Sequence, residues 1–480
     1  MDQHMDQHYD LVVIGAGPAG ESAAVLAATF GHRAVVVERD KPGGTVTTTG
    51  GAPTKTLREA ALYLTGFRHR DLYGITVAAP PEVVLAELAA RTRTVCLQLQ
   101  QVVAQNLARN QVAYRPGVAR LGPDRAVVVQ TPEGEVATLT GEVVLIATGS
   151  RPLRPANIPF DDPDVCDSDQ IFKLNRVTHH LFIIGAGAVG VEFATIFAAL
   201  GAHVTLSDAA DRMLAAMDGE IAHLMADQLT QAGVEVVLGA STRAIERVDG
   251  QLRVTLDNGA VYRPDAVLFA AGRRANTEGL GLEAAGVQVD PRGRIAVNAA
   301  YQTTAAGIYA AGDVVAPALA SIAMEQGRLA MFRAFNLPFR QELHPLEVSA
   351  VYGVPEVAAV GLTEEACRDQ GLAYEVGRCD LGATPRGAIA GHGGLLKLLF
   401  RRDDRRLLGV HALGDIASEL VGMGQAAINS NEAIDIFAAM TLNTPTYTYA
   451  YKYAAFDGLL RLAAAHGGPS ALATLAAGTP

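Results

Sequence analysis

A glycine-rich turn occurs twice in this chain, each time between a short apolar run and a helix-like segment. The first copy is Gly15-Ala-Gly17-Pro-Ala-Gly20 and the second is Gly185-Ala-Gly187-Ala-Val-Gly190. Glycines at this spacing allow a tight turn, close approach of the backbone to a pyrophosphate, and close packing of the following helix on the strand. The N-terminus of that helix adds N–H donors and the positive end of its dipole. One copy alone is weak evidence, because glycine-rich turns have other causes. Two copies in the same context predict two dinucleotide-binding units and an α/β fold.

An acidic residue closes each of these units. Glu38 follows the apolar run 34–37, and Asp208 comes two residues after the strand-like segment 204–206. An acid at this place accepts a hydrogen bond from a ribose hydroxyl. Asp208 would also repel the 2′-phosphate of NADP, and residues 209–211 offer no arginine, the nearest being Arg212. We therefore expect the second unit to prefer NAD(H), with NADP(H) less favoured.

Three further strand-like runs end in residues suited to a cofactor. They are 144–149, which ends in Thr148 and Gly149, 266–272, which ends in Gly272, and 307–313, which ends in Gly312 and Asp313. The first two follow their own glycine-rich units by a similar interval, so we expect them to contribute to the two cofactor sites. Asp313 could bind a hydroxyl of the sugar chain of a flavin cofactor. The alternative role for Asp313, a helix N-cap, is compatible with this one.

Composition narrows the class of protein. The 480 residues include 49% apolar and 19% charged residues, which indicates a globular chain of more than one domain. The formal net charge of −11 argues against a nucleic-acid partner, and no uncharged apolar run reaches the ~18 residues that would insert in a membrane. The cysteines form no CxxC pair and no cluster with zinc-ligand spacing, so we expect no metal site and a cytoplasmic protein with reduced thiols.

Residues 43–55 read Gly-Gly-Thr-Val-Thr-Thr-Thr-Gly-Gly-Ala-Pro-Thr-Lys. This frame resembles the active-site loop of the flavoprotein pyridine nucleotide-disulfide oxidoreductases, the class of glutathione reductase and dihydrolipoamide dehydrogenase. In that class two redox cysteines stand at the positions of Val46 and Gly51. Neither residue can form a thiolate, so the resemblance implies a loop without a sulfur that accepts electrons from the flavin. Gly44 and Thr45 precede the first position, and we expect them to contact the cofactor.

The resemblance covers about residues 9–462 and implies the whole fold. It implies an α/β protein with two Rossmann-like domains, one for FAD and one for NAD(P), and an α+β C-terminal dimerisation domain. The implied boundaries are 9–154 and 283–344 for the FAD domain, 155–282 for the NAD(P) domain and 345–465 for the interface domain, with flexible termini at 1–8 and 466–480. It also implies a homodimer in which the partner chain completes each active site.

Within this class the chain is similar to the soluble pyridine nucleotide transhydrogenases. The matching stretches are 145–152, 167–169, 301–303, 374–378, 443–446 and 454–459. That family also lacks the cysteine pair, but it keeps one cysteine in the loop and an acidic residue near the C-terminus, where this chain has Val46 and Tyr449. Disulfide reductases of the class use a His–Glu dyad as acid and base on the thiol substrate. Here Thr444 and Tyr449 replace the dyad, and neither exchanges protons near neutral pH, since a tyrosine pKa is ~10. Disulfide reduction by the usual mechanism is therefore excluded.

The residues of the nicotinamide side are retained. Lys55 resembles the lysine beside flavin N5, and Glu192 resembles the glutamate that pairs with it near the nicotinamide. The resemblance implies that this pair is catalytic and that Lys55 stabilises negative charge on the reduced flavin. The alternative is a structural salt bridge, in which hydrogen bonding offsets the desolvation cost of burial.

Together these residues predict an FAD-dependent NAD(P)H oxidoreductase that passes hydride to a small-molecule acceptor other than a disulfide. In the transhydrogenase version, a second nicotinamide replaces the first on the same flavin face. The alternative is an NADH:quinone reductase of the diaphorase type, whose acceptor uses space left by the lost cysteines and dyad. A second alternative is a non-catalytic sensor that binds FAD and NAD(H). The retention of Lys55 and Glu192 argues against the sensor.

Four tyrosines alternate near the C-terminus, at positions 447, 449, 451 and 453. In a helix, Tyr449 and Tyr453 would be neighbours on one face and Tyr447 and Tyr451 on another. Their rings could stack on a quinone or pack at the dimer interface.

Overall fold

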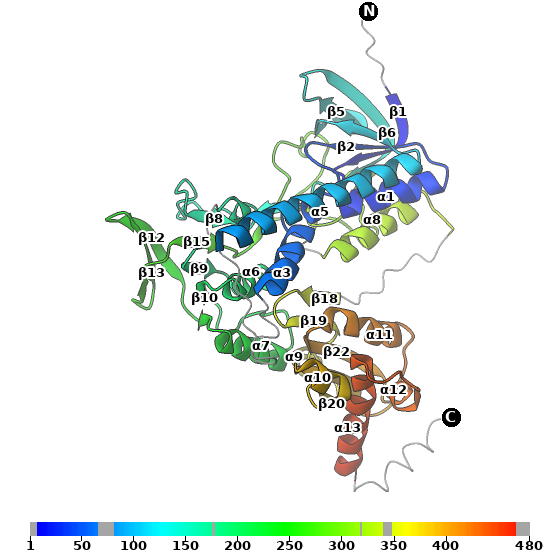
Figure 1. The fold of residues 1–480 in the computed structure, drawn as a ribbon. Coiled ribbons are helices and arrows are strands. Elements are labelled where there is room, and N and C mark those ends of the chain that lie inside the picture. Colours follow the sequence, from blue (N-terminus) through cyan, green and yellow to red (C-terminus); the bar gives the residue numbers. More distant parts are fainter. Residues whose placement is uncertain (1–6, 66–80, 175–177, 317–318, 339–347, 467–480) are drawn as a thin grey trace, which may run out of the picture.

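In the computed structural model, the chain forms three units that each contain a β-sheet (Figure 1). The structure describes residues 7–65, 81–174, 178–316, 319–338 and 348–466. The first unit contains a seven-stranded sheet, the second a five-stranded parallel sheet, and the third a five-stranded antiparallel sheet. The predicted α/β fold class with an α+β C-terminal domain is confirmed.

The first sheet has the strand order β3-β2-β1-β6-β5-β4, with β17 paired to β6. β1, β2, β3, β6 and β17 run parallel, whereas β4, β5 and β6 form an antiparallel extension. The strands are β1 (Gln7–Ile14), β2 (Ala34–Glu38), β3 (Ala113–Pro116), β4 (Val118–Leu121), β5 (Ala126–Gln130), β6 (Val136–Ile146) and β17 (Ile308–Ala310). The chain thus returns to this sheet after it has completed the second unit.

Alanines and glycines let the helices of the first unit pack closely. The helices are α1 (Pro18–Thr29), α2 (Thr45–Thr48), α3 (Ala52–Thr65), α5 (Pro81–Arg109) and α8 (Ala320–Ala334). α8 lies beside α1, and a Cβ at Gly327 would be only 2.2 Å from the carbonyl oxygen of Ala19. The long helix α5 runs from this unit toward the second one (Figure 1).

The second sheet has the order β11-β10-β9-β15-β8, and all of its strands are parallel. Its elements are β8 (Val165–Asp167), β9 (His180–Ile184), α6 (Ala188–Ala199), β10 (His203–Ser207), α7 (Gly219–Gln231), β11 (Glu235–Val237) and β15 (Ala266–Phe269). An antiparallel arm of β12 (Thr242–Val248), β13 (Gln251–Leu256) and β14 (Val261–Tyr262) projects from it (Figure 1). The antiparallel pair β7 (Ser150–Pro152) and β16 (Arg273–Ala275) lies where the chain passes between the first two units.

The third sheet has the order β18-β19-β22-β21-β20. Its strands are β18 (Val348–Val351), β19 (Glu356–Gly361), β20 (Tyr374–Asp380), β21 (Leu395–Arg401) and β22 (Leu407–Gly414). Its helices are α9 (Glu364–Asp369), α10 (Pro385–Ala390), α11 (Ala417–Asn429), α12 (Asp435–Ala439) and α13 (Ala450–Ala465). The rings of Tyr449 and Tyr453 are 5.2 Å apart, as the helical spacing predicts. Tyr451 is fully buried, and its hydroxyl donates to the carbonyl oxygen of Leu420 at 2.7 Å, so this tyrosine belongs to the core.

A buried ionic cluster fixes the second unit against the third. Lys397 of β21 is almost fully buried, and its ammonium donates to Asp218 at 2.7 Å and lies 2.9 Å from Glu220. Glu364 also pairs with Lys397, and Arg378 donates to Glu220 at 2.9 Å. Burial opposes charge on Asp218, yet the hydrogen bond from Lys397 holds the pKa of this carboxyl below its ordinary value. Because Asp218 is the N-cap of α7, the cluster ties the start of this helix to the third sheet.

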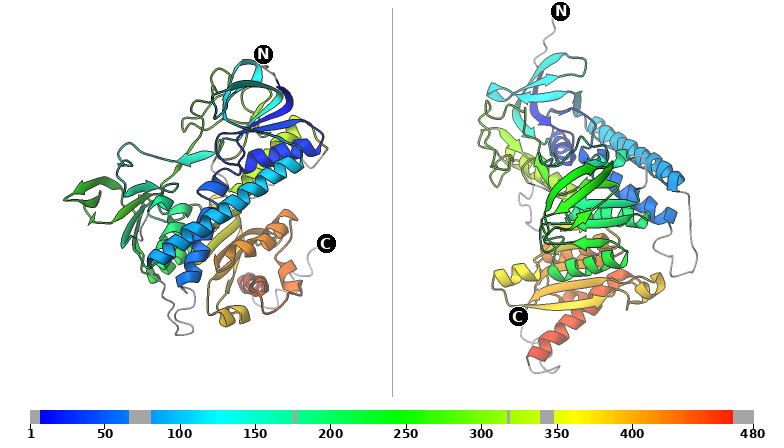
Figure 2. Two further views of the ribbon diagram at one scale, coloured as in Figure 1. Left: turned by 45° about the horizontal axis from the view of Figure 1, so that its top comes forward. Right: turned by 90° about the vertical axis from the view of Figure 1, so that its left-hand side faces the viewer.

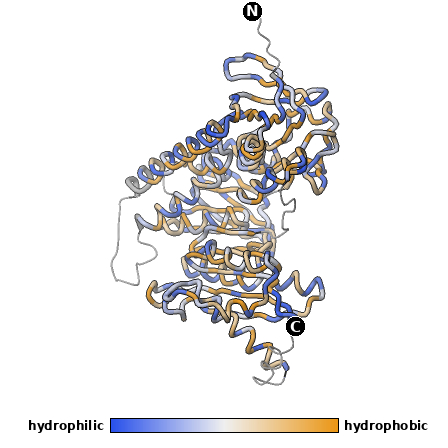
Figure 3. The backbone as a smooth tube through the Cα atoms, turned by 90° about the vertical axis from the view of Figure 1, so that its right-hand side faces the viewer, coloured by the Kyte–Doolittle hydropathy of each residue, from blue (hydrophilic) through white to orange (hydrophobic). Residues whose placement is uncertain are grey.

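The layers have apolar interiors and polar edges. The views in Figure 2 place the third sheet on one side of the other two, and Figure 3 shows apolar strands inside the layers with hydrophilic turns around them. The predicted flexible terminus 1–8 is wrong for Gln7 and His8, because they pair with Leu139 and Thr140 as the first residues of β1. Residues 1–6 and 467–480 lie outside the described residues. Among the helices of the described ranges, none combines the length and the apolar character needed to cross a bilayer.

Candidate active site

Both glycine-rich turns have the tight backbone that their pattern predicts. Gly15 and Gly185 each have a φ of 107°. A Cβ at Gly15 would lie 2.4 Å from the carbonyl oxygen of Ala147. A Cβ at Gly20 would be 2.0 Å from the carbonyl oxygen of Gly15, and one at Gly190 would be 1.8 Å from that of Gly185. Only glycine fits these positions, so strand, turn and helix are in direct contact.

The two predicted ribose-binding acids lie against the turns. Glu38 accepts the backbone N–H of Ala16 at 2.7 Å, and Asp208 accepts that of Ala186 at 2.6 Å. The second oxygen of each carboxylate accepts an N–H two residues further along the chain, at 2.9 and 2.8 Å. A carboxylate has more lone pairs than these bonds use, so each acid can still accept a hydroxyl.

The helices that follow the turns begin without a side-chain cap. α1 starts after Gly17 and α6 after Gly187, and neither N-cap glycine provides a side-chain cap. A Cβ at either glycine would meet no heavy atom within 4 Å, so the space beside each helix start is open. Free N–H donors at an open helix start suit phosphate oxygens. The residues of the first unit therefore fit the pyrophosphate of FAD, and those of the second fit a nicotinamide dinucleotide.

The loop 43–55 begins beside the first turn. Gly44 has a φ of 55°, and a Cβ there would be 3.1 Å from the Cα of Gly17. α2 starts at Thr45, and the hydroxyl of Thr47 donates to the carbonyl oxygen of Pro42 at 2.7 Å, which ties the loop to the chain before it. Gly44 and Thr45 thus lie next to the open helix start, as their predicted contact with the cofactor requires.

Val46 and Gly51, the positions at which the resemblance places two redox cysteines, are in direct contact. A Cβ at Gly51 would lie 2.7 Å from the Cα of Val46 and 2.8 Å from its carbonyl oxygen. We expected the loss of two sulfurs to leave space here. At Gly51 this expectation is wrong, because the backbone of Val46 occupies the place of a side chain.

We expect the substitution Gly51→Ala to destabilise the protein by about 1–3 kcal/mol, because the added methyl meets backbone atoms that cannot rotate away. The matched control is Gly422→Ala in α11, where a Cβ would meet nothing within 4 Å and the φ is ordinary. That control is expected to be neutral or slightly stabilising. Denaturant unfolding of the three proteins measures the difference. Equal stability of the two variants would contradict the contact between Val46 and Gly51.

Lys55 and Glu192 meet as predicted. The ammonium of Lys55 lies 3.0 and 2.9 Å from the two carboxylate oxygens of Glu192, and the pair joins α3 of the first unit to α6 of the second. Glu192 is 6% exposed, whereas the Lys55 side chain is 34% exposed and stays partly accessible. The backbone N–H of Tyr352 donates to Glu192 at 3.0 Å, which helps to offset the burial of this carboxylate.

The third unit contributes Tyr352 to the same place. Its ring centroid is 4.8 Å from the ammonium of Lys55, within cation–π range. Burial raises the pKa of the Tyr352 phenol, and the nearby carboxylates of Glu356 and Glu192 raise it further. Tyr352 lies between β18 and β19, where no sequence motif marks it. All three units therefore meet around Lys55.

Asp313 lies just after β17 and is held by polar neighbours. The hydroxyl of Ser150 donates to Asp313 at 2.6 Å, and Arg273 donates to Ser150 at 2.8 Å. The preceding Gly312 has a φ of 80°. The alternative role of Asp313 as a helix N-cap is wrong, because the next helix is α8 and its N-cap is Leu319.

Thr148, Gly149 and Gly272 lie where the first two units join. Thr148 donates its hydroxyl to the carbonyl oxygen of Asn276 at 2.8 Å, and the N–H of Asn276 donates to Gly149 at 2.9 Å. The N–H of Leu153 donates to Gly272 at 3.1 Å. The structure thus brings together the ends of the segments 144–149 and 266–272, which follow the two glycine-rich turns at similar intervals in the sequence.

The three buried cysteines are unsuited to replace a redox pair. All four are free, and Cys166, Cys367 and Cys379 are buried. Burial raises the pKa of Cys166 to about 12 and those of Cys367 and Cys379 to about 11, so these thiols are protonated at neutral pH. In the described ranges, no group of three or more His, Cys, Asp or Glu side chains is placed to hold a metal.

Comparison with known proteins agrees with this geometry. Residues 9–327 match the pyridine nucleotide-disulphide oxidoreductase family, and residues 348–455 match its dimerisation domain. The chain is 39% identical over 464 residues to the soluble pyridine nucleotide transhydrogenase of Mycobacterium bovis BCG Pasteur, with 95% of this chain and 98% of the relative covered. It is 36% identical to the enzyme of the same name from a Marinomonas strain, with 95% and 99% covered.

Solved structures of the same fold are also similar. The crystal structure of LpdA from Mycobacterium tuberculosis has a TM-score of 0.86 at 26% identity, with 94% of this chain and 99% of that chain covered. The copper(II) complex of the flavoprotein disulfide reductase RclA from Escherichia coli has a TM-score of 0.84 at 28% identity, with 94% and 99% covered. The chain therefore belongs to the pyridine nucleotide-disulphide oxidoreductase family and is a flavin-dependent pyridine nucleotide oxidoreductase similar to the soluble transhydrogenases.

Proposed function

We propose that this protein takes hydride from NADH and passes it, through FAD, to a small-molecule acceptor that is not a disulfide. The contact between Val46 and Gly51 carries the proposal, because it replaces the redox disulfide while the Lys55–Glu192 pair is intact. When bound, the flavin supplies the hydride chemistry. The two glycine-rich turns hold the phosphates, and Glu38 and Asp208 orient the adenosine riboses.

The Lys55–Glu192 pair has the features of a charge-stabilising site. Glu192 and the ring of Tyr352 fix the position of the ammonium, so little reorganisation is needed when negative charge develops nearby. The exposed side of Lys55 is the side that a cofactor could approach. This arrangement also argues against a sensor that only binds its cofactors.

The surroundings of Asp208 support a preference for NADH over NADPH. Arg212 is the nearest arginine along the chain, but its guanidinium is 3.1 Å from Glu365 and 2.8 Å from the carbonyl oxygen of Ala215. These contacts direct the Arg212 guanidinium to Glu365 and Ala215. A 2′-phosphate beside Asp208 would thus meet a carboxylate while Arg212 is engaged elsewhere.

The substitution Asp208→Asn is expected to reduce the preference for NADH by about tenfold, equivalent to about 1.4 kcal/mol. The amide oxygen can still accept one of the two N–H groups that Asp208 binds, those of Ala186 and Ala210, whereas the negative charge and the other bond are lost. The ratio of kcat/KM for NADH and NADPH measures the change. The control is Asp211→Asn, an exposed carboxylate nearby, which should leave the ratio unchanged. A wild-type preference for NADPH would contradict the role of Asp208.

The acceptor is tested by anaerobic stopped-flow experiments on the holoprotein. The protein is first reduced with NADH or NADPH and then mixed with thio-NAD⁺ or a benzoquinone. Rapid reoxidation by thio-NAD⁺ supports transhydrogenase activity. The relatives at 34–39% identity are named for this activity. Rapid reoxidation by the quinone alone supports the second candidate, an NADH:quinone reductase, which the Asp208 geometry favours. Reoxidation by neither acceptor, or slow reduction by both nucleotides, would overturn the proposal.

We also propose a homodimer formed through the third unit. The family match to the dimerisation domain supports it. On α13, Tyr453, Phe456 and Leu460 are 44%, 46% and 54% exposed, and such apolar side chains suit a contact with a second copy.

A further inference from the structure

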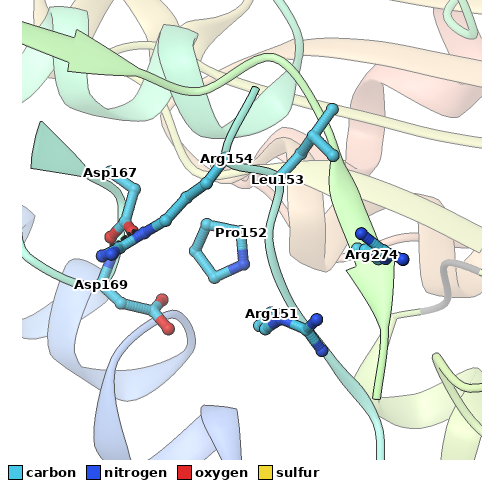
Figure 4. A pocket seen from close by; sticks show the side chains of 7 residues that line it. All are labelled: Arg151, Pro152, Leu153, Arg154, Asp167, Asp169 and Arg274. Carbon is cyan, nitrogen blue, oxygen red and sulfur yellow. Dashed lines mark hydrogen bonds and ion pairs between the residues drawn. The ribbon is translucent and has the colours of Figure 1, made fainter. Parts of the chain in front are cut away.

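A pocket of about 330 Å³ lies between the first and second units, beside the β7–β16 pair (Figure 4). Its lining residues are Arg151, Pro152, Leu153, Arg154, Asp167, Asp169 and Arg274. A pocket of this size can hold a small organic molecule. The glycine-rich turns and the Lys55–Glu192 pair are not part of its lining, so it is separate from the residues assigned to the two dinucleotides.

Two guanidinium groups on one side of the pocket share a single exposed carboxylate. Glu278 is 2.6 Å from Arg151 and 2.8 Å from Arg274, and its own side chain is 58% exposed. Arg151 is further fixed by the side-chain oxygen of Asn276 at 3.0 Å. Exposed ion pairs contribute little free energy, so another anion can replace Glu278 at small cost. Two arginines that already converge on one carboxylate are suited to bind a carboxylate or phosphate.

The opposite wall carries one ion pair and one further carboxylate, that of Asp169. Arg154 binds Asp167 through two nitrogens, at 2.7 and 2.6 Å. The second oxygen of Asp167 accepts the N–H groups of Asp169 and Gln170 at 2.9 and 3.0 Å. Figure 4 shows Arg154 lying against Asp167, and the opposite charges of this pair cancel. An entering anion would therefore be attracted toward Arg151 and Arg274.

Asp169 leaves one polar atom without a partner in the lining. Its Oδ1 is buried and accepts no hydrogen bond from any described residue, whereas its carboxylate interacts with the hydroxyl of Thr49. A buried acceptor without a donor is costly, and a ligand hydroxyl or N–H could remove this cost. Thr49 belongs to the loop between Val46 and Gly51, so the pocket touches the segment that replaced the redox disulfide.

We propose that this pocket binds a small organic anion with a hydrogen-bond donor at its other end. The carboxylate or phosphate of the ligand takes the place of Glu278 between Arg151 and Arg274, and its donor group meets Asp169. Asn276 connects Arg151 to Thr148 of the cofactor-binding segment, and Thr49 connects Asp169 to the loop. Binding of a ligand in the pocket can therefore affect the residues around the cofactor through these contacts.

Calorimetric titration of the holoprotein with four probes tests the site. The probes are 4-hydroxybenzoate, phenyl phosphate, benzoate and phenol. We expect saturable binding of the anions, with phenol at least tenfold weaker, and the comparison of 4-hydroxybenzoate with phenyl phosphate distinguishes carboxylate from phosphate ligands. 4-Hydroxybenzoate should bind several-fold tighter than benzoate, and this advantage should vanish in Asp169→Ala, which removes the acceptor.

Substitution of the exposed Glu278 provides a second test, with a matched control. Glu278→Gln should tighten anion binding by about tenfold, because it removes the competing group without removing an arginine. Glu283→Gln removes an equally negative, exposed side chain elsewhere and should leave binding unchanged. Arg274→Gln should weaken binding by at least tenfold. The proposal is overturned if no anion binds saturably to the wild type or to Glu278→Gln, or if the Glu278 and Glu283 variants bind equally.

Discussion

Replacement of Lys55 by methionine is expected to slow the reduction of the holoprotein by NADH by about 100-fold, the usual effect of removing one charge-stabilising donor. Methionine keeps the length of the side chain but cannot stabilise developing negative charge. Anaerobic stopped-flow absorbance at saturating NADH measures the rate of the reductive step directly. The affinity for NADH should change much less, because Asp208 and the second glycine-rich turn lie on other elements.

The alternative for Lys55 is a purely structural salt bridge, and a second measurement distinguishes it. A structural role predicts that Lys55→Met lowers the unfolding temperature while the reductive rate stays near that of the wild type. Lys41→Met, an exposed lysine in the preceding segment, controls for loss of charge and should alter neither quantity. Glu192→Gln should also slow reduction, because the amide no longer fixes the ammonium as strongly.

Replacement of Lys397 by methionine is expected to destabilise the protein by about 3–5 kcal/mol, the typical cost of breaking a buried ion pair from one side. Three carboxylates, those of Asp218, Glu220 and Glu364, would lose their shared cation. Chemical denaturation measures the loss. Arg461→Met, in which a 51% exposed guanidinium leaves Asp457 on α13, is the control and should cost less than about 1 kcal/mol. Similar losses in the two variants would show that the Lys397 cluster is not desolvated.

The same cluster predicts how stability depends on pH. The pKa values of Asp218 and Glu220 are lowered, since hydrogen bonds from Lys397 and Arg378 outweigh burial. Their contribution is present above their unfolded pKa values of about 4 and is lost as the pH falls below them. Burial lowers the pKa of His411, which is fully buried, so the unfolded chain gains a proton first below pH ~6.5 and the folded state loses stability there.

Melting temperatures between pH 4 and pH 8 test this dependence. We expect a plateau near neutral pH, a decline from about pH 6.5, and a steeper fall near pH 4. His411→Gln should make the first decline shallower, with the remainder from His180, whose pKa burial also lowers, whereas the exposed His223→Gln should leave it unchanged. A flat profile between pH 5 and pH 7 in the wild type would contradict the role of His411.

Much of the site could be predicted from local sequence because its geometry is local. Gly15 and Gly20 must be glycine for steric reasons within a few residues, and Glu38 reaches the turn simply because it ends the next strand. The pairing of Lys55 with Glu192 was predictable only from family resemblance, since no local rule relates α3 to α6. The side-by-side contact of Val46 and Gly51 depends on how the loop bends, which residue types alone do not specify.

Other parts depend on packing between units and left no sequence signal. Tyr352 reaches Lys55 only because the third unit docks there, and its neighbours Gly353 and Pro355 resemble any turn. In the sequence, Lys397 is one charged residue within an otherwise apolar strand, and nothing marks it as buried. It becomes a buried cation because α7 packs against this strand. Asp169 was visible as part of the stretch 167–169, but its unpartnered oxygen appears only in three dimensions.

The close contact at Gly51 also has an evolutionary consequence. A cysteine restored at position 51 would first meet the backbone of Val46, and a cysteine restored at position 46 would find no partner sulfur. Neither single change yields a working thiol pair, and removing the valine side chain does not relieve a contact with its backbone. Substitution of both positions by cysteine would give a thiol pair only if the loop itself also moved. Main-chain geometry is thus a barrier to the evolution of a thiol pair at these two positions.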